Sequence, residues 1–387
     1  MLSSVRSASV LAASGMSVTV EAHIGLGLPA FTILGRPDDV CRESRDRVGS
    51  ALDLAIAISL LVADEKISPE CVEGVAFIGE LALDGRVRPV AGVAPMALAL
   101  RDQADITTVV VPAENVHEAR IVDPPGLKAA TSLREVVEAL TGCGPWPLCD
   151  SDAGDVESDA RLPDLCDVRG QAAARLGLEL SAAGGHHLLL VGPPGAGKTM
   201  LAQRLPGILP RLDQVTSLEA TLVRSAAGEP LPRGGLVSHA PIRMPHHSAS
   251  TVSMVGGGSS SLRPGEVSLA HGGVLFLDEL GEFAPSTLDA LRQPLEEGVV
   301  RIARANARVS MPARFTLVGA TNPCPCGGGA PGECECDERA LARYRRRFNG
   351  PFLDRFDVRV LVHRPKVDEL LGDAAGEPSS AVVERVQ

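Results

Sequence analysis

Hydrophobic residues follow two patterns along this chain, and each pattern predicts a different kind of strand. Residues 17–24 alternate apolar and polar side chains, which is typical of a strand with one buried face. Residues 188–191, 274–277 and 315–320 are short continuous apolar runs, which favour parallel strands covered on both faces. The later part of the chain is therefore expected to hold a buried parallel sheet.

The first 141 residues predict an α+β unit, because short strand patterns and helix patterns follow one another without a regular repeat. A Gly- and Pro-containing break at 25–29 ends the first strand. The further predicted elements are a strand at 30–34, a helix at 38–61, a hairpin at 75–90 around Asp84-Gly85, a strand at 107–111 and a helix at 133–140.

Composition changes after residue 141. Residues 142–163 contain the structure-breaking run Gly144-Pro145-Trp146-Pro147 and an acidic, polar stretch at 150–159 with too little apolar surface to pack. We expect a linker there. Residues 164–387 then predict an α/β domain built on the parallel strands.

The run that ends the strand at 188–191 has the spacing of a P-loop. Its glycines allow backbone N–H groups to surround a phosphate chain, Lys198 can reach the β- and γ-phosphates, and the hydroxyl of Thr199 can bind Mg²⁺. The predicted ATP-binding residues are Gly192, Pro193, Pro194, Gly195, Ala196, Gly197, Lys198, Thr199 and Met200, the last opening a helix expected over 200–205.

Two other predicted strands end in polar residues suited to phosphate chemistry. Asp278 and Glu279 follow the run at 274–277. We expect Asp278 to hold Mg²⁺ through water and Glu279 to polarise the attacking water as a general base. Asn322 follows the run at 315–320 and is placed to orient that water or to sense the γ-phosphate.

Composition limits the class of protein. The chain has 387 residues, a hydrophobic content of 45% and a formal net charge of −11. This charge argues against nucleic-acid binding by the whole surface but permits a local basic strip. The N-terminal residues lack a signal-peptide pattern, and the longest apolar run, 54–63, is too short to span a bilayer. We expect a cytoplasmic protein without membrane contact.

The nine cysteines are expected to be thiols or metal ligands rather than disulfides. Cys324, Cys326, Cys334 and Cys336 form two close pairs and match the ligand count of a four-cysteine zinc site. The Cys-x-Cys spacing is tighter than usual, so a thiol-rich surface loop is the alternative. Residues 241–265, with paired histidines His246-His247, predict a mobile loop rather than a metal site.

Arginines suggest two further roles. Arg301, Arg304 and Arg308 decorate a predicted hairpin over 299–311, which is either a solvated edge or a pore hairpin that grips phosphates. A helix over 288–298 precedes it, and a basic run over 343–347 follows. Arg355 is a candidate arginine finger acting on a neighbouring subunit's ATP, with a local ion pair to Asp354 or Asp357 as the alternative.

Residues 79–93 and 109–115 resemble the catalytic domain of Lon proteases. In that domain a lysine stands where this chain has Ala94, and a serine where it has Ile56. The resemblance therefore implies a Lon-like scaffold without peptidase chemistry.

Five motifs follow one another in the later part of the chain, at 246–250, 255–258, 263–271, 322–327 and 350–355. With these motifs the sequence resembles, along nearly its whole length, the YifB/ComM family of magnesium-chelatase-like AAA+ proteins. The resemblance implies a Lon-like N-terminal domain, a chelatase-type AAA+ module and a hexameric ring that drives DNA branch migration. It does not imply metal chelation.

Two departures from this family are expected to matter. The chain joins Leu52 to Asp53 where the family has further residues of the N-terminal domain, and it ends at Gln387, without the helical lid. Three functions therefore stay open: an ATP-driven DNA motor, a nucleotide-dependent protein-remodelling scaffold, and a truncated member that binds ATP without productive turnover.

Overall fold

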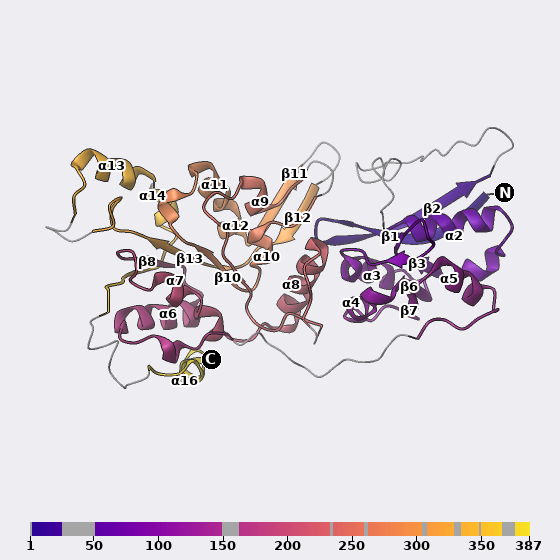
Figure 1. The fold of residues 1–387 in the computed structure, drawn as a ribbon, viewed down its shortest axis with the longest axis horizontal. Helices are drawn as coiled ribbons and strands as arrows, with labels where there is room; N and C mark the ends of the chain where they lie inside the picture. The colour runs from indigo at the N-terminus through magenta and orange to yellow at the C-terminus, as the bar shows by residue number, and fades with distance from the viewer. Residues whose placement is uncertain are drawn as a thin grey trace.

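The computed structural model describes residues 2–24, 51–148, 162–232, 235–258, 262–303, 308–328, 334–347, 350–365 and 376–387. These ranges contain two five-stranded sheets, one in the N-terminal part and one in the C-terminal part (Figure 1). The predicted strand at 30–34, the first part of the predicted helix at 38–61 and the acidic stretch at 150–159 lie outside them. No helix in these ranges is long and apolar enough to cross a membrane.

The N-terminal sheet has the order β2-β1-β3-β6-β7. Its strands are β1 (Leu2–Leu11), β2 (Ser14–His23), β3 (Val75–Phe77), β6 (Thr108–Pro112) and β7 (Lys128–Ala130). β1 and β2 pair antiparallel, whereas the other neighbours are parallel. The helices are α2 (Asp53–Ala63), α3 (Val93–Arg101), α4 (Val116–Arg120) and α5 (Leu133–Leu140), and 3₁₀ turns occupy Pro69–Val72 and Ala113–Asn115.

The described structure confirms the α+β prediction for this part and corrects one element. The predicted hairpin at 75–90 is shorter, because only β4 (Glu80–Leu81) and β5 (Val87–Arg88) pair around Asp84-Gly85. Val75–Phe77 instead joins the main sheet between β1 and β6. Its three residues are all buried, which an edge hairpin would not achieve.

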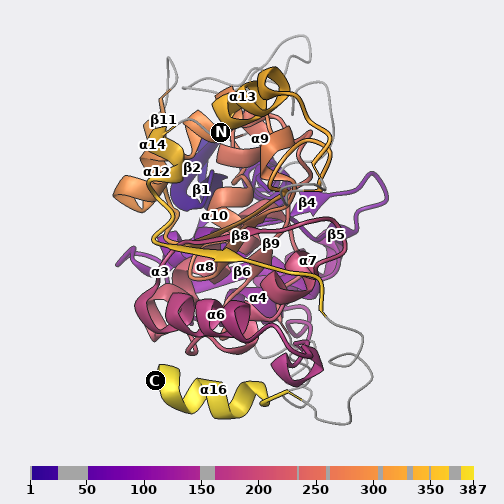
Figure 2. The same ribbon diagram turned by 90° about the vertical axis from the view of Figure 1, so that its left-hand side faces the viewer.

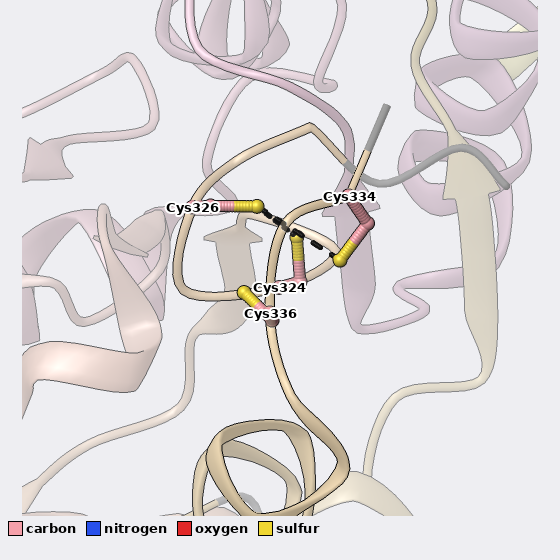
Figure 3. Close-up of side chains that lie close together, drawn as sticks. All are labelled: Cys324, Cys326, Cys334 and Cys336. Atoms are coloured by element: carbon pink, nitrogen blue, oxygen red, sulfur yellow. Dashed lines mark hydrogen bonds between the residues drawn. The ribbon is translucent and has the colours of Figure 1, made fainter. Parts of the chain in front are cut away.

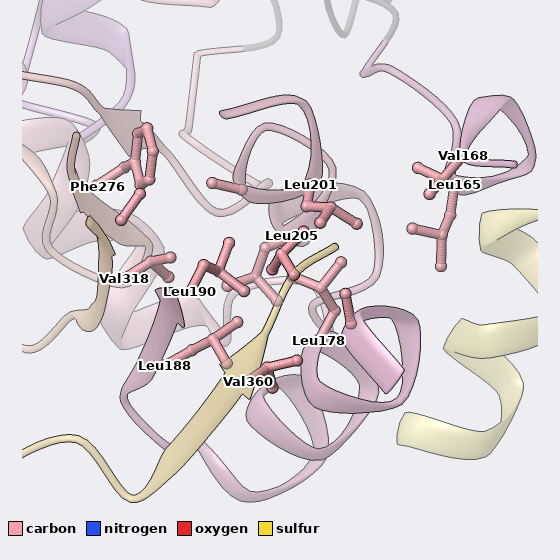
Figure 4. Packing of buried hydrophobic residues seen from close by; sticks show 14 of the residues in the cluster. Leu165, Val168, Leu178, Leu188, Leu190, Leu201, Leu205, Phe276, Val318 and Val360 are labelled. Carbon is pink, nitrogen blue, oxygen red and sulfur yellow. The ribbon is translucent and has the colours of Figure 1, made fainter. Parts of the chain in front are cut away.

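The C-terminal sheet is wholly parallel and has the order β14-β8-β13-β10-β9. Its strands are β8 (Leu188–Val191), β9 (Ile242–Arg243), β10 (Val274–Leu277), β13 (Thr316–Thr321) and β14 (Val358–Leu361). The three continuous apolar runs are thus neighbours in one sheet, as predicted. Side chains of β8, β13 and β14 pack against α6 (Ala172–Gly184) and α7 (Lys198–Ala202), as Figure 4 shows for Leu188, Leu190 and Leu178.

The remaining elements lie between and around these strands. They are α8 (Gln214–Ala227), α9 (Thr251–Val255), α10 (Glu266–Leu269), α11 (Pro285–Ala290), α12 (Arg292–Glu297), the antiparallel hairpin of β11 (Val299–Ala303) and β12 (Arg308–Pro312), α13 (Glu338–Arg347), α14 (Gly350–Leu353) and α16 (Ser379–Val386); 3₁₀ turns occupy Leu165–Asp167, Leu205–Gly207 and Leu280–Glu282. α16 packs under α6, where Arg385 pairs with Glu179 (Figures 1 and 2).

Two predictions for this part are wrong. The helix expected over 288–298 is divided into α11 and α12, because Pro294 has no N–H to bond the carbonyl of Ala290. The stretch 241–265 is not a continuous loop in its described residues, since it contains β9 and α9. The Oγ of Ser250 accepts a hydrogen bond from the N–H of Ser253 and so caps α9.

The β1–β2 hairpin joins the two sheets. Its tip reaches the C-terminal part beside β12 (Figure 1), where Ala12 is 2% exposed. We call this group of buried residues the hairpin cluster; it contains Ala12, Leu275, Leu277, Val300, Val309, Met311, Leu317, Phe352 and Phe356. At Gly15 the hairpin passes so close to α3 that a Cβ would lie 1.8 Å from the carbonyl oxygen of Pro95. Only glycine fits there.

The hairpin tip gives a stability prediction. Ala12→Asp should lower the free energy of unfolding by about 3 kcal/mol, because it places a carboxylate in an apolar cluster. Ala12 has a φ of 57°, a conformation that Asp tolerates, so burial rather than backbone strain would cause the loss. Urea unfolding measures the change.

Leu83→Asp is the matched control, since Leu83 is 94% exposed in the turn between β4 and β5. Its effect should stay within about 0.5 kcal/mol. Equal effects of the two substitutions would contradict the burial of the hairpin tip.

Candidate functional site

The carboxyl ends of β8, β13 and β10 meet at one edge of the C-terminal sheet. Thr321 pairs with Val191, and Leu277 pairs with Gly319, so the residues that follow these strands emerge close together. The P-loop follows β8, Asn322 follows β13, and Asp278 follows β10. Ligands of parallel sheets bind at this edge, beyond the carboxyl ends of the strands.

The ammonium group of Lys198 joins two of these strand ends. Its Nζ donates hydrogen bonds to the carbonyl oxygens of Gly192 (2.7 Å) and Pro193 (3.0 Å) and to Oδ1 of Asn322 (3.1 Å). Burial lowers the pKa of Lys198, and the charges of Asp278 and Glu279 act in the opposite direction. The lysine of the P-loop is thus bonded to the residue that follows β13, a contact that the sequence did not predict.

Thr199 and Asp278 lie together at the same edge. The hydroxyl of Thr199 donates to Oδ2 of Asp278 over 2.6 Å, and Oδ1 of Asp278 accepts from the backbone N–H of Glu279 over 2.8 Å. A hydroxyl and a carboxylate oxygen are ligands of the kind that Mg²⁺ binds beside substrate phosphates. The donor set therefore fits the cation that the sequence predicts.

The loop around these groups is a turn that opens α7. Gly195 and Gly197 have φ values of 77° and 89°, and Ala196 is buried beneath the turn. Pro193, Pro194 and Met200 complete the predicted set, with Met200 inside α7. α7 ends at Ala202, earlier than the predicted residue 205.

Glu279 has a contact that sequence reasoning missed. Nδ1 of His247 lies 3.3 Å from Oε2 of Glu279, and the His247 ring meets Phe283 edge to face. Glu279 also has a φ of 48°, which is uncommon for a non-glycine residue and is found at functional sites. The sequence predicted only that the paired histidines belong to a mobile loop rather than to a metal site.

Two further polar side chains border the P-loop. Nε2 of Gln171 donates to the carbonyl oxygens of Ala196 and His363, and the guanidinium of Arg364 donates to the carbonyl oxygen of Pro194. Gln171 directly precedes α6. Arg364, just beyond β14, was missed because its sequence neighbourhood has no motif.

Arg355 lies at the other end of the sheet from the P-loop. It precedes β14, whose residues Val358 and Leu361 pair in parallel with Leu188 and Val191, so it stands near the beginning of β8 rather than its end. Its Nη2 pairs with Oε1 of Glu296 on α12. Neither Asp354 nor Asp357 is its ion-pair partner: Asp354 lies beside Arg359, and Asp357 beside His186.

The four cysteines after β13 converge. Cys324, Cys326, Cys334 and Cys336 place their Sγ atoms within 4.8 Å of one another (Figure 3). Hydrogen bonds from the backbones of Gly328 and Glu335 lower the pKa of Cys326 to about 6. The positions of the four Sγ atoms thus bring the two cysteine pairs together, as a four-ligand site requires.

The predicted basic hairpin is present as β11 and β12. Arg301 and Arg308 are exposed on it, and Arg301 forms an ion pair with Glu297 at 2.9 Å. Arg304 lies outside the described residues. Arg343 is exposed on α13, the helix that carries the basic run.

A parallel sheet with a P-loop after one strand and an acidic pair after another defines a P-loop protein of the AAA+ type. The family profile described as "Magnesium chelatase, subunit ChlI" matches residues 164–370, and a profile described as "Subunit ChlI of Mg-chelatase" matches residues 48–115.

Relatives align along nearly the whole chain. An uncharacterized protein of Mycobacterium tuberculosis is 42% identical over 412 aligned positions, covering 98% of this chain and 80% of the relative. The Escherichia coli protein YifB is 39% identical over 415 positions, covering 100% and 81%. Competence protein ComM of Haemophilus influenzae is 39% identical over 402 positions, covering 95% and 78%. The chain belongs to the YifB/ComM family of magnesium-chelatase-like AAA+ proteins.

Family membership favours the use of nucleotide and Mg²⁺. The alignment with the M. tuberculosis protein is longer than the 387 residues of this chain, so that relative contains residues without a counterpart here.

Proposed function

We propose that this chain binds and hydrolyses ATP and uses that energy to remodel DNA as a ring-forming, branch-migration motor in the cytoplasm. The observation that carries the ATPase proposal is the meeting of Lys198, Asn322, Thr199 and Asp278 at one edge of the parallel sheet. The proposed division is a Lon-like, non-peptidase domain at 1–141, a linker at 142–163 and a chelatase-type AAA+ domain at 164–387.

Each residue at this edge has a proposed role in phosphoryl transfer. The P-loop backbone and Lys198 would bind the phosphates, and Asn322, already bonded to Lys198, would orient the attacking water. Glu279 would accept a proton from that water, and His247 is placed to hold its carboxylate. Thr199 and Asp278 would hold Mg²⁺, which neutralises charge on the phosphates when bound.

The DNA part of the proposal rests on exposed arginines. Arg308 on the β11–β12 hairpin and Arg343 on α13 are exposed, and phosphate contacts of arginine supply sequence-independent affinity. Arg301 contributes less, because Glu297 neutralises it locally. A ring of six subunits would bring several such hairpins to one strand of DNA.

The net charge of −11 favours a second function, a nucleotide-dependent scaffold that remodels a protein client. ATPase assays with branched DNA, linear DNA and no DNA separate the two. Stimulation by branched DNA supports the motor, and DNA-independent turnover supports the scaffold. Nucleotide binding without turnover identifies the third function, a family member that binds ATP unproductively.

The first prediction for this site concerns binding. Wild-type protein should gain about 2.7 kcal/mol of stability at an ATP·Mg²⁺ concentration of about a hundred times the dissociation constant. Lys198→Ala should abolish this gain, measured by thermal unfolding, because the phosphates lose their contact with the ammonium group of Lys198. Lys66→Ala, at an exposed lysine of the N-terminal part, should keep the full shift. An unchanged shift in Lys198→Ala would remove the P-loop from the assignment.

The second prediction concerns hydrolysis. Glu279→Gln should retain the thermal shift with ATP and lower the hydrolysis rate by about 10²–10⁴-fold, because the amide cannot accept the proton of the attacking water. Phosphate release in single-turnover assays measures the rate. Glu70→Gln, at an exposed glutamate of the N-terminal part, should hydrolyse ATP at the wild-type rate. Full activity in Glu279→Gln would exclude it as the general base.

The third prediction concerns Arg355, which we propose acts on a neighbouring subunit's ATP. Arg355→Ala should leave nucleotide affinity unchanged and lower assembly-dependent turnover by about 10³–10⁵-fold, because the guanidinium no longer neutralises charge in the transition state. Loss of its exposed pair with Glu296 should change stability by less than about 1 kcal/mol.

Mixing provides the control for action between subunits. Arg355→Ala mixed with Lys198→Ala should recover part of the turnover, since some interfaces then pair an intact P-loop with an intact arginine. Arg359→Ala, at an exposed arginine of β14 that pairs with Asp354, should behave as wild type. Absence of recovery in mixtures shown to form mixed oligomers would assign Arg355 a structural role through Glu296.

A further inference from the structure

The four-cysteine cluster has the dimensions of a metal site. The Sγ atom of Cys326 lies 3.3 Å from that of Cys324 and 3.9 Å from that of Cys334, and Cys336 completes a set whose members are all within 4.8 Å. Four thiolates around one Zn²⁺, with bonds of about 2.3 Å in tetrahedral geometry, place their sulfur atoms about 3.8 Å apart. The sulfur positions therefore need only small shifts to bind one ion (Figure 3).

We propose that these cysteines form a four-thiolate zinc centre that fastens α13 and the segment after β13 to each other and to the P-loop. The existence of the centre is independent of the proposed ATPase function. Only its effect on hydrolysis rests on that function.

The ligand chemistry selects the metal. All four groups are soft sulfur donors, which favour Zn²⁺ over the hard cations Mg²⁺ and Ca²⁺. Four thiolates also fill the tetrahedral coordination of Zn²⁺ and leave no position for water, as in structural rather than catalytic zinc sites. The centre would thus stabilise local structure and take no part in the chemistry of the site.

The contacts around the cysteines show what such a centre would hold. Cys324 stands two residues after Asn322, and Cys336 stands two residues before α13. From α13, the hydroxyl of Tyr344 donates to the carbonyl oxygen of Asn322 over 3.0 Å and lies 3.0 Å from Oγ1 of Thr321. The helix is thereby bonded to the residue that also binds Lys198.

The same segment touches the P-loop directly. Gly327 has a φ of 81°, and a Cβ on it would lie 2.8 Å from Cδ of Pro194. A metal that holds Cys324, Cys326 and α13 together would fix this contact. Loss of the metal would free both Asn322 and one wall of the P-loop at once.

Metal analysis tests the centre without any use of ATP. Protein purified without chelators should contain one Zn²⁺ per chain, and Cys326→Ser and Cys336→Ser should each lose most of it. Cys143→Ser, at an exposed cysteine outside the cluster, is the matched control and should keep it. Replacement by Co²⁺ should give the thiolate-to-metal absorption of a tetrahedral four-sulfur site.

Two outcomes would overturn the centre. One is a wild-type chain that contains no zinc and gives no thiolate-to-Co²⁺ absorption when Co²⁺ is added under reducing conditions. The other is zinc that persists in both cluster variants. Because Cys326 is exposed, its serine variant should fold, and far-ultraviolet circular dichroism checks this.

Amide hydrogen exchange tests the fastening. Zinc removal from the wild-type chain should increase exchange at the end of β13 and in α13 at least about tenfold, with β1 and β6 unchanged as an internal reference. Equal exchange with and without zinc would overturn the fastening, whatever the ATPase result. If zinc removal slowed hydrolysis but left nucleotide binding unchanged, this would support a role of the centre in holding Asn322 in position for the attacking water.

Discussion

The parallel pairing of β8, β13 and β10 is the constraint on which the candidate site depends. Parallel strands in register bring their carboxyl ends to one edge, so residues far apart in sequence, Lys198, Asn322 and Asp278, meet there. Lys198 then links the P-loop to the end of β13 through hydrogen bonds to both. A shift in the register of β13 would move Asn322 away from the ammonium group, and so the precision of the site comes from the sheet.

The junction of the two sheets depends on a different kind of interaction, the burial of small side chains. The β1–β2 tip can enter the hairpin cluster because Ala12 carries only a methyl group. Beside it, α8 packs Leu218 and Leu222 against the N-terminal core, and the hydroxyl of Ser225 donates to Glu118. The two parts therefore meet at a hairpin tip and along a helix, which limits how freely one can rotate on the other.

The sequence predicted the residues at the sheet edge because continuous apolar runs end in conspicuous polar groups, as in Leu277 followed by Asp278. It did not predict contacts between segments that are distant in sequence and carry no recognisable motif. The contact of His247 with Glu279 and the burial of Ala12 in the C-terminal core arise only from the tertiary fold. Pro294 marks the division of α11 from α12, but Leu288, Leu291 and Leu295 keep a helical spacing across it and so predicted one continuous helix. Convergence of the cysteines required a loop path that ligand spacing alone does not determine.

The hairpin cluster also connects two features proposed to act between molecules. Phe352 and Phe356 flank Arg355, pack edge to face at 5.8 Å, and are buried in the same cluster as Val300 and Val309 of the β11–β12 hairpin. Close-packed interiors transmit displacement rather than absorb it. If the phosphates of a neighbouring subunit's ATP moved Arg355 away from Glu296, Phe352 and Phe356 would shift as well. That shift would change the packing beneath the β11–β12 hairpin. The β1–β2 tip, through Ala12 in that cluster, would extend the same mechanical connection to the N-terminal sheet.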